Sequence, residues 1–346
     1  MKTEEYMQPI WSGNIVHEES IMYIQGQDGV VSAAPLLYIP EKILEVRSSD
    51  QKVTYEEGKD YILNGGYLFR TEESRIPCWG YEEFYPPHGT EVPIASLAEA
   101  GRYIRYDRGD IYAAHQVCVT YTHQDRWRGP IPEGQLYRLP GLSGKWKQKE
   151  PVTIVYLGDS IMEGCDASGH WKVPPYMPIL SEILTRMLHH KYGCPIEGVN
   201  RAVGGKTAEW GERQVEERIL PYKPDLVILG FGMNDGVHPR KYEEQIEQII
   251  ASTRRNLPRT EFLLVSTMLP NPDGAGWTRY QPEYVWSLRH LASGYPGVGV
   301  ADMTGMSVYL LSRKRFEDMT GNGINHPNDF LVRIYAQTIL ACLTQD

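Results

Sequence analysis

The sequence predicts a two-domain chain in which an all-β domain precedes an α/β domain built on a parallel sheet. Its 346 residues exceed the length of a typical single domain. Short strand-like runs fill residues 1–147, whereas strand-like and helix-like segments alternate over residues 148–346. Such alternation is typical of a parallel sheet covered by helices on both faces.

The first domain, residues 1–147, is predicted to be a β-sandwich of the jelly-roll kind. Runs such as "KVTYEEGKDYIL" and "HQVCVTYTHQ" alternate in part, and Val117, Val119 and Tyr121 of the second run share one face. Gly and Pro interrupt these runs in "NGGY", "YPPHG" and "GPIPEG". The next stretch, "LPGLSGKWKQKEP" (139–151), is interpreted as a linker.

The second domain, residues 148–346, is predicted to hold a five-stranded parallel sheet. The expected strands are 152–158, 196–200, 225–231, 261–267 and 298–302. Helices are expected within 176–193, 241–257, 282–293 and 330–343. In a sheet of this kind, ligands bind beside the carboxyl ends of the strands, so the chemistry is expected there.

Composition excludes several classes of partner. The net charge is -9, the pI is near 5.6, and no basic run suggests a nucleic-acid partner. No stretch has the length and apolarity of a membrane span, and the first residues lack the apolar core of a signal peptide. Five cysteines without a CxxC pair suggest reduced thiols, and hence a cytoplasmic protein. The sequence gives no indication of the oligomeric state.

Four loops at predicted strand ends or helix entries carry residues suited to acyl transfer. Ser160 lies in "GDSIMEG", Gly205 in "NRAVGGKT", Asn234 in "GMNDG" and His326 in "GNGINHPND". Taken alone, Ser160 is better explained as a helix N-cap than as a nucleophile. Serine is a weak nucleophile that needs a base within hydrogen-bond reach, and His326 is the candidate base. The fold is expected to bring all four loops to one rim of the sheet.

The same loops provide donors for a developing oxyanion. Acyl transfer places negative charge on the carbonyl oxygen, which fixed N–H groups stabilise. The backbone N–H groups of Ser160 and Gly205 and the side-chain amide of Asn234 are the predicted donors. Glycine suits the second position because it lets a backbone N–H approach closely.

Together these four blocks resemble those of the GDSL/SGNH hydrolase superfamily over roughly residues 152–346. The resemblance implies a three-layer α/β/α, flavodoxin-like domain and ester hydrolysis through an acyl-enzyme, with neither metal nor other cofactor. It also implies that Ser160 is the nucleophile and His326 the base. Gly205 and Asn234 would complete the oxyanion hole with Ser160.

The chain departs from the family pattern beside the histidine. The family usually has Asp three residues before it, and Gly323 stands there. A main-chain carbonyl within 322–324 is therefore predicted to orient the ring of His326, giving a Ser–His dyad. The side chains considered as alternatives for this role are Asn322, Asp318 and Asp329.

Other motifs favour structural interpretations. The "GGKT" segment matches the end of a phosphate-binding loop, but Asn200 stands where that motif requires its first glycine. Asp159 and Asp235 are expected to hold backbone N–H groups in a supporting role, since no histidine cluster joins them to make a metal site.

The substrate is expected to be a small ester or an ester of an oligosaccharide. Trp277 and Tyr280 follow a strand end and are candidates for lining a substrate cleft, although packing under a loop explains them equally well. A β-sandwich before such a hydrolase resembles carbohydrate esterases, so acetylated xylo-oligosaccharides are the expected substrate type. A general carboxylesterase or lipase-like acyl hydrolase is the alternative, and a non-catalytic carbohydrate-binding protein is a more distant one.

Overall fold

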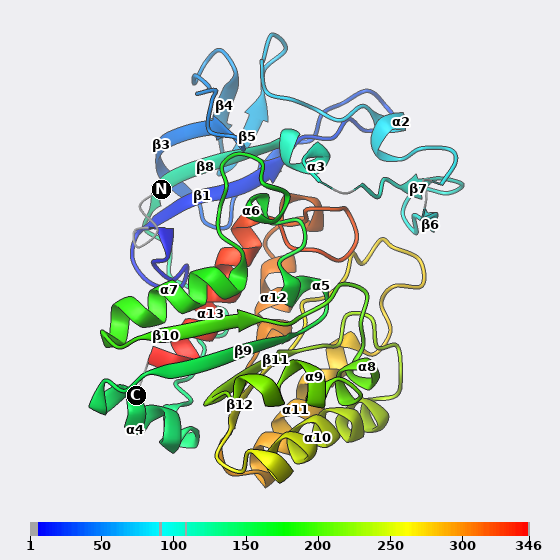
Figure 1. Ribbon diagram of the computed structural model, residues 1–346. Coiled ribbons are helices and arrows are strands. Elements are labelled where there is room, and N and C mark those ends of the chain that lie inside the picture. Colours follow the sequence, from blue (N-terminus) through cyan, green and yellow to red (C-terminus); the bar gives the residue numbers. More distant parts are fainter. Residues whose placement is uncertain (1–5, 90–91, 108, 345–346) are drawn as a thin grey trace.

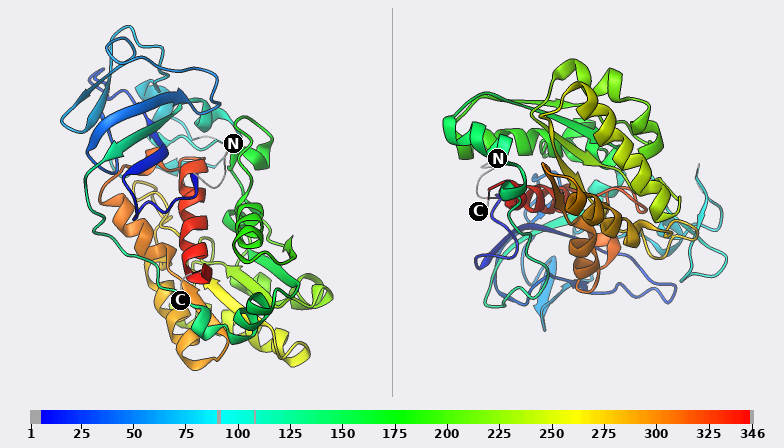
Figure 2. Two further views of the ribbon diagram at one scale, coloured as in Figure 1. Left: turned by 90° about the vertical axis from the view of Figure 1, so that its left-hand side faces the viewer. Right: turned by 90° about the horizontal axis from the view of Figure 1, so that it is seen from below.

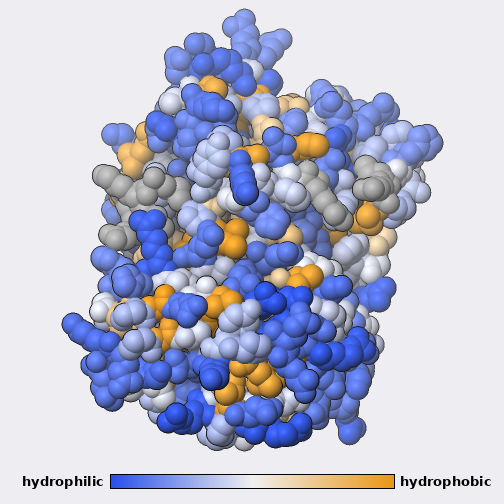
Figure 3. All heavy atoms as spheres, in the orientation of Figure 1, coloured by the Kyte–Doolittle hydropathy of each residue, from blue (hydrophilic) through white to orange (hydrophobic). Residues whose placement is uncertain are grey.

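The computed structural model describes residues 6–89, 92–107 and 109–344. A β-rich N-terminal domain lies against a larger α/β domain, and the C-terminal helix runs between them (Figures 1 and 2). None of the helices in these ranges is both long and apolar enough to cross a membrane. The face shown in Figure 3 is mostly hydrophilic, with small and separate apolar patches. All five cysteines lie in the described ranges and are free thiols.

The N-terminal domain consists of small antiparallel sheets. In the described part of the chain their orders are β1-β8-β3, β2-β5-β4 and β6-β7. The strands are β1 (Ile15–Met22), β2 (Ala34–Pro35), β3 (Pro40–Ser48), β4 (Tyr61–Asn64), β5 (Tyr67–Arg70), β6 (Ile94–Ala95), β7 (Tyr103–Ile104) and β8 (Gln116–His123). Short helices α2 (Tyr81–Phe84) and α3 (Ile111–Ala114) interrupt them. The all-β character is confirmed, and the jelly-roll topology and the boundary at residue 147 stay predictions.

The predicted face of β8 is confirmed. Val117, Val119 and Tyr121 are all fully buried. They lie in one apolar cluster with Val46 of β3 and Leu68 of β5, so the two three-stranded sheets share a core. Alternation along a strand therefore identified the inward face correctly.

The α/β domain contains the predicted parallel sheet. Within the described residues it has five strands in the order β10-β9-β11-β12-β13, and all four pairings are parallel. The strands are β9 (Val152–Gly158), β10 (Ile196–Asn200), β11 (Leu226–Gly230), β12 (Glu261–Val265) and β13 (Val298–Ala301). Their bounds agree with the expected ones to within two residues, because buried apolar runs mark parallel strands clearly.

Helices cover both faces of this sheet, which gives the three layers. They are α5 (Ser160–Glu163), α6 (Ser168–Trp171), α7 (Leu180–Tyr192), α8 (Ala208–Glu212), α9 (Val215–Arg218), α10 (Pro239–Asn256), α11 (Gln281–Gly294), α12 (Met303–Leu311) and α13 (Asp329–Thr344). Three short 3-10 helices are η1 (Leu136–Arg138), η2 (Leu220–Tyr222) and η3 (Phe316–Asp318). Alternate strand residues divide between two cores: Ile154 and Tyr156 face α7 and α13, whereas Val155 and Leu157 face α10 and α11.

The predicted linker is a helix instead, α4 (Pro140–Gln148). Its first turn is capped by a residue far away in the sequence: the Glu261 carboxylate accepts the N–H groups of Gly141 and Leu142 at 2.8 Å each. Trp146 is buried and stacks on Tyr192, with ring centroids 4.0 Å apart. These tertiary contacts override a local composition of Gly, Ser and Lys, which is why the sequence suggested a linker.

Helix α13 is buried along almost its whole length because the sheet lies on one side and the N-terminal domain on the other. Its polar residues bond to that domain. Arg333 donates to the Glu18 carbonyl at 2.7 Å, and Gln337 accepts the Ile10 N–H at 3.1 Å. A helix that is apolar nearly all round is expected to be enclosed in this way.

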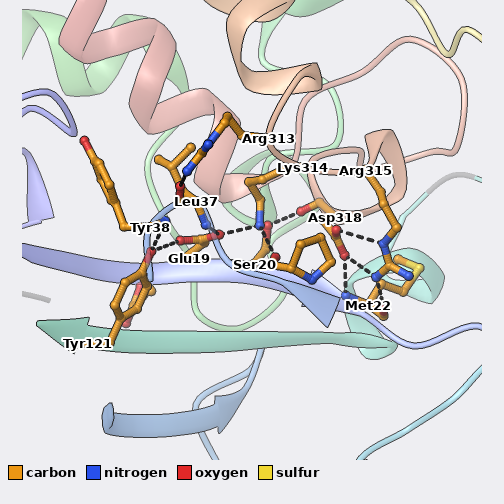
Figure 4. A network of polar contacts seen from close by, with 12 residues as sticks. Glu19, Ser20, Met22, Leu37, Tyr38, Tyr121, Arg313, Lys314, Arg315 and Asp318 are labelled. Atoms are coloured by element: carbon orange, nitrogen blue, oxygen red, sulfur yellow. Dashed lines mark hydrogen bonds and ion pairs between the residues drawn. The ribbon is translucent and has the colours of Figure 1, made fainter. Parts of the chain in front are cut away.

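A buried ion pair joins the two domains (Figure 4). The Lys314 ammonium contacts the Glu19 carboxylate, and neither side chain is exposed to solvent. Glu19 also accepts the Leu37 N–H at 2.8 Å and the Tyr121 hydroxyl at 2.6 Å. Such a pair is tolerated inside a protein because its remaining hydrogen-bonding positions are filled.

We expect Lys314→Met to lower the free energy of unfolding by about 3–5 kcal/mol, because it leaves the Glu19 charge buried without its cation. Urea denaturation at neutral pH measures the change. Arg213→Met is the matched control, since Arg213 pairs with Glu209 on the surface, where an ion pair contributes little. An equal cost for the two variants would contradict the stabilising role of the buried pair.

Candidate active site

Ser160 stands at the carboxyl end of β9, which lies between β10 and β11 in the sheet, as the first residue of α5. The end of β9 lies close to β11, because an added Cβ on Gly158 would overlap the Gly230 carbonyl oxygen. Asp159 is the N-cap and accepts the Ile161 N–H at 3.0 Å. The N-cap interpretation of this motif therefore applies to Asp159, and the serine hydroxyl is left for other contacts.

His326 meets Ser160 as predicted. The two atoms involved, His326 Nε2 and Ser160 Oγ, are 2.8 Å apart although their residues are 166 positions apart in the chain. Both side chains are buried. This is the distance and pairing that proton transfer from serine to imidazole requires.

The prediction about what orients His326 is wrong. Its second ring nitrogen, Nδ1, contacts the carboxylate of Asp166, not a main-chain carbonyl. Asp166 lies six residues after Ser160, in the loop that follows α5, in a left-handed conformation with φ of 63°. Its other oxygen accepts the Trp171 indole N–H at 2.8 Å. The sequence did not point to this acid, because the family's usual spacing places the acid three residues before the histidine.

Asn322, one of the predicted orienters, shapes the loop instead of touching the ring. Its side-chain oxygen accepts the backbone N–H groups of Ile324, Asn325 and His326 at 3.0, 3.0 and 3.2 Å. Its amide donates to the Asn325 side chain at 2.9 Å. Asn322 thus fixes the backbone that carries the histidine.

The two predicted aspartates also bond elsewhere. Asp318 accepts the Met22 N–H at 2.8 Å and pairs with Arg315 at 2.8 Å. Asp329 accepts the Ser168 N–H at 2.8 Å. Both are engaged by other segments, so neither side chain takes the role of Asp166.

The two predicted oxyanion residues lie on the loops that follow β10 and β11. Gly205 has a φ of 72°, which favours glycine. One N–H of the Asn234 amide donates to the Lys206 carbonyl at 3.1 Å, which anchors the side chain to the Gly205 loop. An amide has two N–H groups, so the second is left for a ligand.

Glu163 was not predicted, and it holds the loop that follows β10 against the serine. Its carboxylate accepts the Gly204 N–H at 2.6 Å. A Cβ added to Gly204 would lie 3.6 Å from Ser160 Cβ, so this loop passes directly beside the serine. Both ends of the contact, the Glu of "GDSIMEG" and the first Gly of "GGKT", were visible in the sequence, but nothing there related them.

Asp159 and Asp235 support the backbone, as predicted. Asp235 accepts the Ala208 N–H at 2.7 Å, as Asp159 does for Ile161. Burial raises the pKa of Asp159 to about 7 and that of Asp235 to about 6. No three of the His, Cys, Asp and Glu side chains that the structure describes are grouped so that they could share a metal ion.

The two candidate cleft aromatics are partly buried in packing positions. Trp277 packs against Ile324 of the histidine loop and against Ile94 of β6. Tyr280 packs into the second core, with its ring centroid 5.8 Å from that of His238. Their role in a substrate cleft stays a prediction.

The fold and the site together define the class of the protein. The family model described as GDSL-like Lipase/Acylhydrolase family matches residues 156–330, about half of the chain. This match includes the serine and histidine blocks and both loops between them. The chain belongs to the GDSL-like lipase/acylhydrolase family.

Solved structures share this fold. A two-domain esterase (CEX) active on acetylated mannans, co-crystallised with mannopentaose, is 22% identical with a TM-score of 0.50; the match covers 60% of this chain and 54% of that one. The match therefore spans about half the length of that esterase. An acetylxylan esterase of Geobacillus stearothermophilus, Axe2, is 16% identical with a TM-score of 0.47, covering 56% of this chain and 95% of that one. A search of curated proteins gave no match.

Proposed function

We propose that this protein is a serine esterase that hydrolyses carboxylic esters through an acyl-enzyme. The observation that carries the proposal is the continuous contact from Ser160 through His326 to Asp166. Nucleophile, base and acid on three segments within hydrogen-bond reach form a general arrangement for acyl transfer. Family membership supports the same conclusion.

In the proposed reaction, Ser160 Oγ attacks the ester carbonyl carbon while His326 Nε2 takes its proton. The carbonyl oxygen becomes an oxyanion that accepts hydrogen bonds from the Ser160 and Gly205 N–H groups and from the Asn234 amide. The C–O bond to the alcohol then breaks, and the imidazolium returns the proton to the leaving oxygen. Water then attacks the acyl carbon and loses a proton to His326; the C–Oγ bond breaks, the imidazolium returns the proton to Ser160 Oγ, and the acid is released.

Asp166 keeps the imidazole in the tautomer that this cycle needs. When the Nδ1–H group donates a hydrogen bond to the Asp166 carboxylate, Nε2 presents a lone pair to the serine. The negative carboxylate also stabilises the imidazolium that forms during attack. The side chain of Asp166 is almost completely shielded from solvent, which strengthens both effects because the local dielectric is low.

For the substrate, we propose acetylated carbohydrates of the xylo-oligosaccharide type. Support comes from the two-domain layout and from neighbours described as acting on acetylated mannan and acetylated xylan. A general carboxylesterase acting on longer acyl chains is the second candidate. The contact between Ser160 and His326 favours either enzyme over a non-catalytic carbohydrate-binding protein, since binding alone needs no such pair.

We expect the wild-type chain to release acetate from acetylated xylo-oligosaccharides and to cleave p-nitrophenyl acetate faster than longer p-nitrophenyl esters. Ser160→Ala should abolish nearly all turnover with an unchanged melting temperature, because the mutation removes only the nucleophile. Faster cleavage of long-chain esters would support the second candidate. Absence of turnover in the wild type, together with retained glycan binding, would refute the enzyme proposal.

We expect Asp166→Asn to lower kcat by about 1,000- to 10,000-fold, because an amide favours the wrong imidazole tautomer. Steady-state kinetics with p-nitrophenyl acetate measures this. Asp329→Asn is the matched control, since Asp329 is a partly buried carboxylate nearby in sequence that bonds to Ser168 rather than to the histidine. Similar kcat values for Asp166→Asn and the wild type would restore the dyad interpretation.

A further inference from the structure

The loop that carries His326 is buried from end to end although much of it is polar. Every residue in 319–328 is buried. Buried polar groups need hydrogen-bond partners, and leaving one unpaired is costly. Several of the partners of this loop come from the N-terminal domain, and two of these contacts span 204 and 308 residues of sequence.

Gln116 contacts the loop at Thr320, a residue that is itself hydrogen-bonded to His326. It is the first residue of β8, is buried, and donates through Nε2 to the Thr320 carbonyl at 2.6 Å. The Thr320 hydroxyl in turn donates to the His326 carbonyl at 3.1 Å and accepts the Gly323 N–H at 2.9 Å. Gln116 therefore fixes the residue that closes the loop around the histidine.

The N-terminal domain also limits the loop by packing. Gly323 has a φ of 87°, and an added Cβ would overlap the hydroxyl oxygen of Tyr112, which belongs to α3 and is buried in that domain. The next residue, Ile324, is fully buried in a cluster with Ile94 and Ile104 of the β6-β7 hairpin. The loop therefore has no room to move toward the N-terminal domain.

Both ends of the loop are tied to strand β1. Asn328 donates to the Ser20 hydroxyl at 2.9 Å. Asp318, just before the loop, accepts the Met22 N–H, and Arg315 bonds to the Met22 carbonyl (Figure 4). From the α/β domain, the Asn271 amide donates to the Gly323 carbonyl at 2.7 Å.

We propose that Gln116 is a positioning residue for His326, and that the N-terminal domain is thereby part of the catalytic machinery and not a separate binding module. The proposal rests on the proposed function for the role of His326. Catalysis depends on holding the reacting groups in place, and a displacement of about 1 Å can cost on the order of 100-fold in rate. Because contacts from both domains hold the loop of His326, losing a contact in either domain is expected to displace the base and lower the rate.

The test is Gln116→Met, which keeps the length and volume of the side chain but removes the donor to Thr320. We expect kcat for p-nitrophenyl acetate to fall about tenfold or more while KM stays within about twofold, because the base moves but the substrate contacts remain. In proton NMR, the downfield resonance of the His326 Nδ1 proton should broaden or disappear. The melting temperature shows whether the variant is folded.

Gln124→Met is the matched control, because Gln124 lies just beyond β8 and its amide bonds to Glu41 on the surface. It should leave kcat and the resonance unchanged. Ser20→Ala is a milder second variant that removes the hydroxyl partner of Asn328. It should also lower kcat, and it tests the proposal if Gln116→Met does not fold.

Gln116→Met with the kcat and resonance of the control would overturn the proposal, as would a change in KM alone. Loss of the resonance with a lower kcat would support it. The NMR comparison needs no substrate, so it still tests the positioning role if the wild-type chain proves to hydrolyse no ester.

Discussion

The hydrogen bond between Asp166 and the imidazole of His326 is the interaction on which the rest of the site depends. A histidine can take a proton from serine only if the ring nitrogen facing the hydroxyl has a free lone pair. Asp166 imposes that state from the other side of the ring. Because Asp166 lies only six residues after Ser160, in the loop that follows α5, one short segment carries both the acid and the nucleophile, and the histidine must be brought to both.

Contacts from both domains hold His326 beside Ser160 and Asp166. Segment 319–328 leads into α13 and carries several polar side chains. Its burial is possible only because these polar groups are paired. Asn322 organises it from within, Asn271 holds it from the α/β domain, and Gln116 holds it from the β domain. The N-terminal domain therefore has a structural reason to accompany the hydrolase domain, whatever it contributes to substrate binding.

The sequence predicted those parts of the molecule that depend on short-range pattern. The five parallel strands and their order of appearance followed from apolar runs, and the meeting of Ser160 with His326 followed from the strand-end rule. Asp166 was not predicted, since which carboxylate reaches a ring depends on the path of a loop. Helix α4 was missed for a related reason, because its cap is Glu261, more than 100 residues away. Long-range contacts of this kind leave no local signal.

Labelling with a fluorophosphonate tests the central claim most directly, because this reagent reacts with a serine only when a base activates it. Intact-mass and peptide mass spectrometry give the stoichiometry and the position of the label. The account predicts one label per chain, on Ser160, formed much more slowly when Asp166 is replaced by Asn. A label on another residue, or equal labelling rates with and without the Asp166 carboxylate, would contradict it.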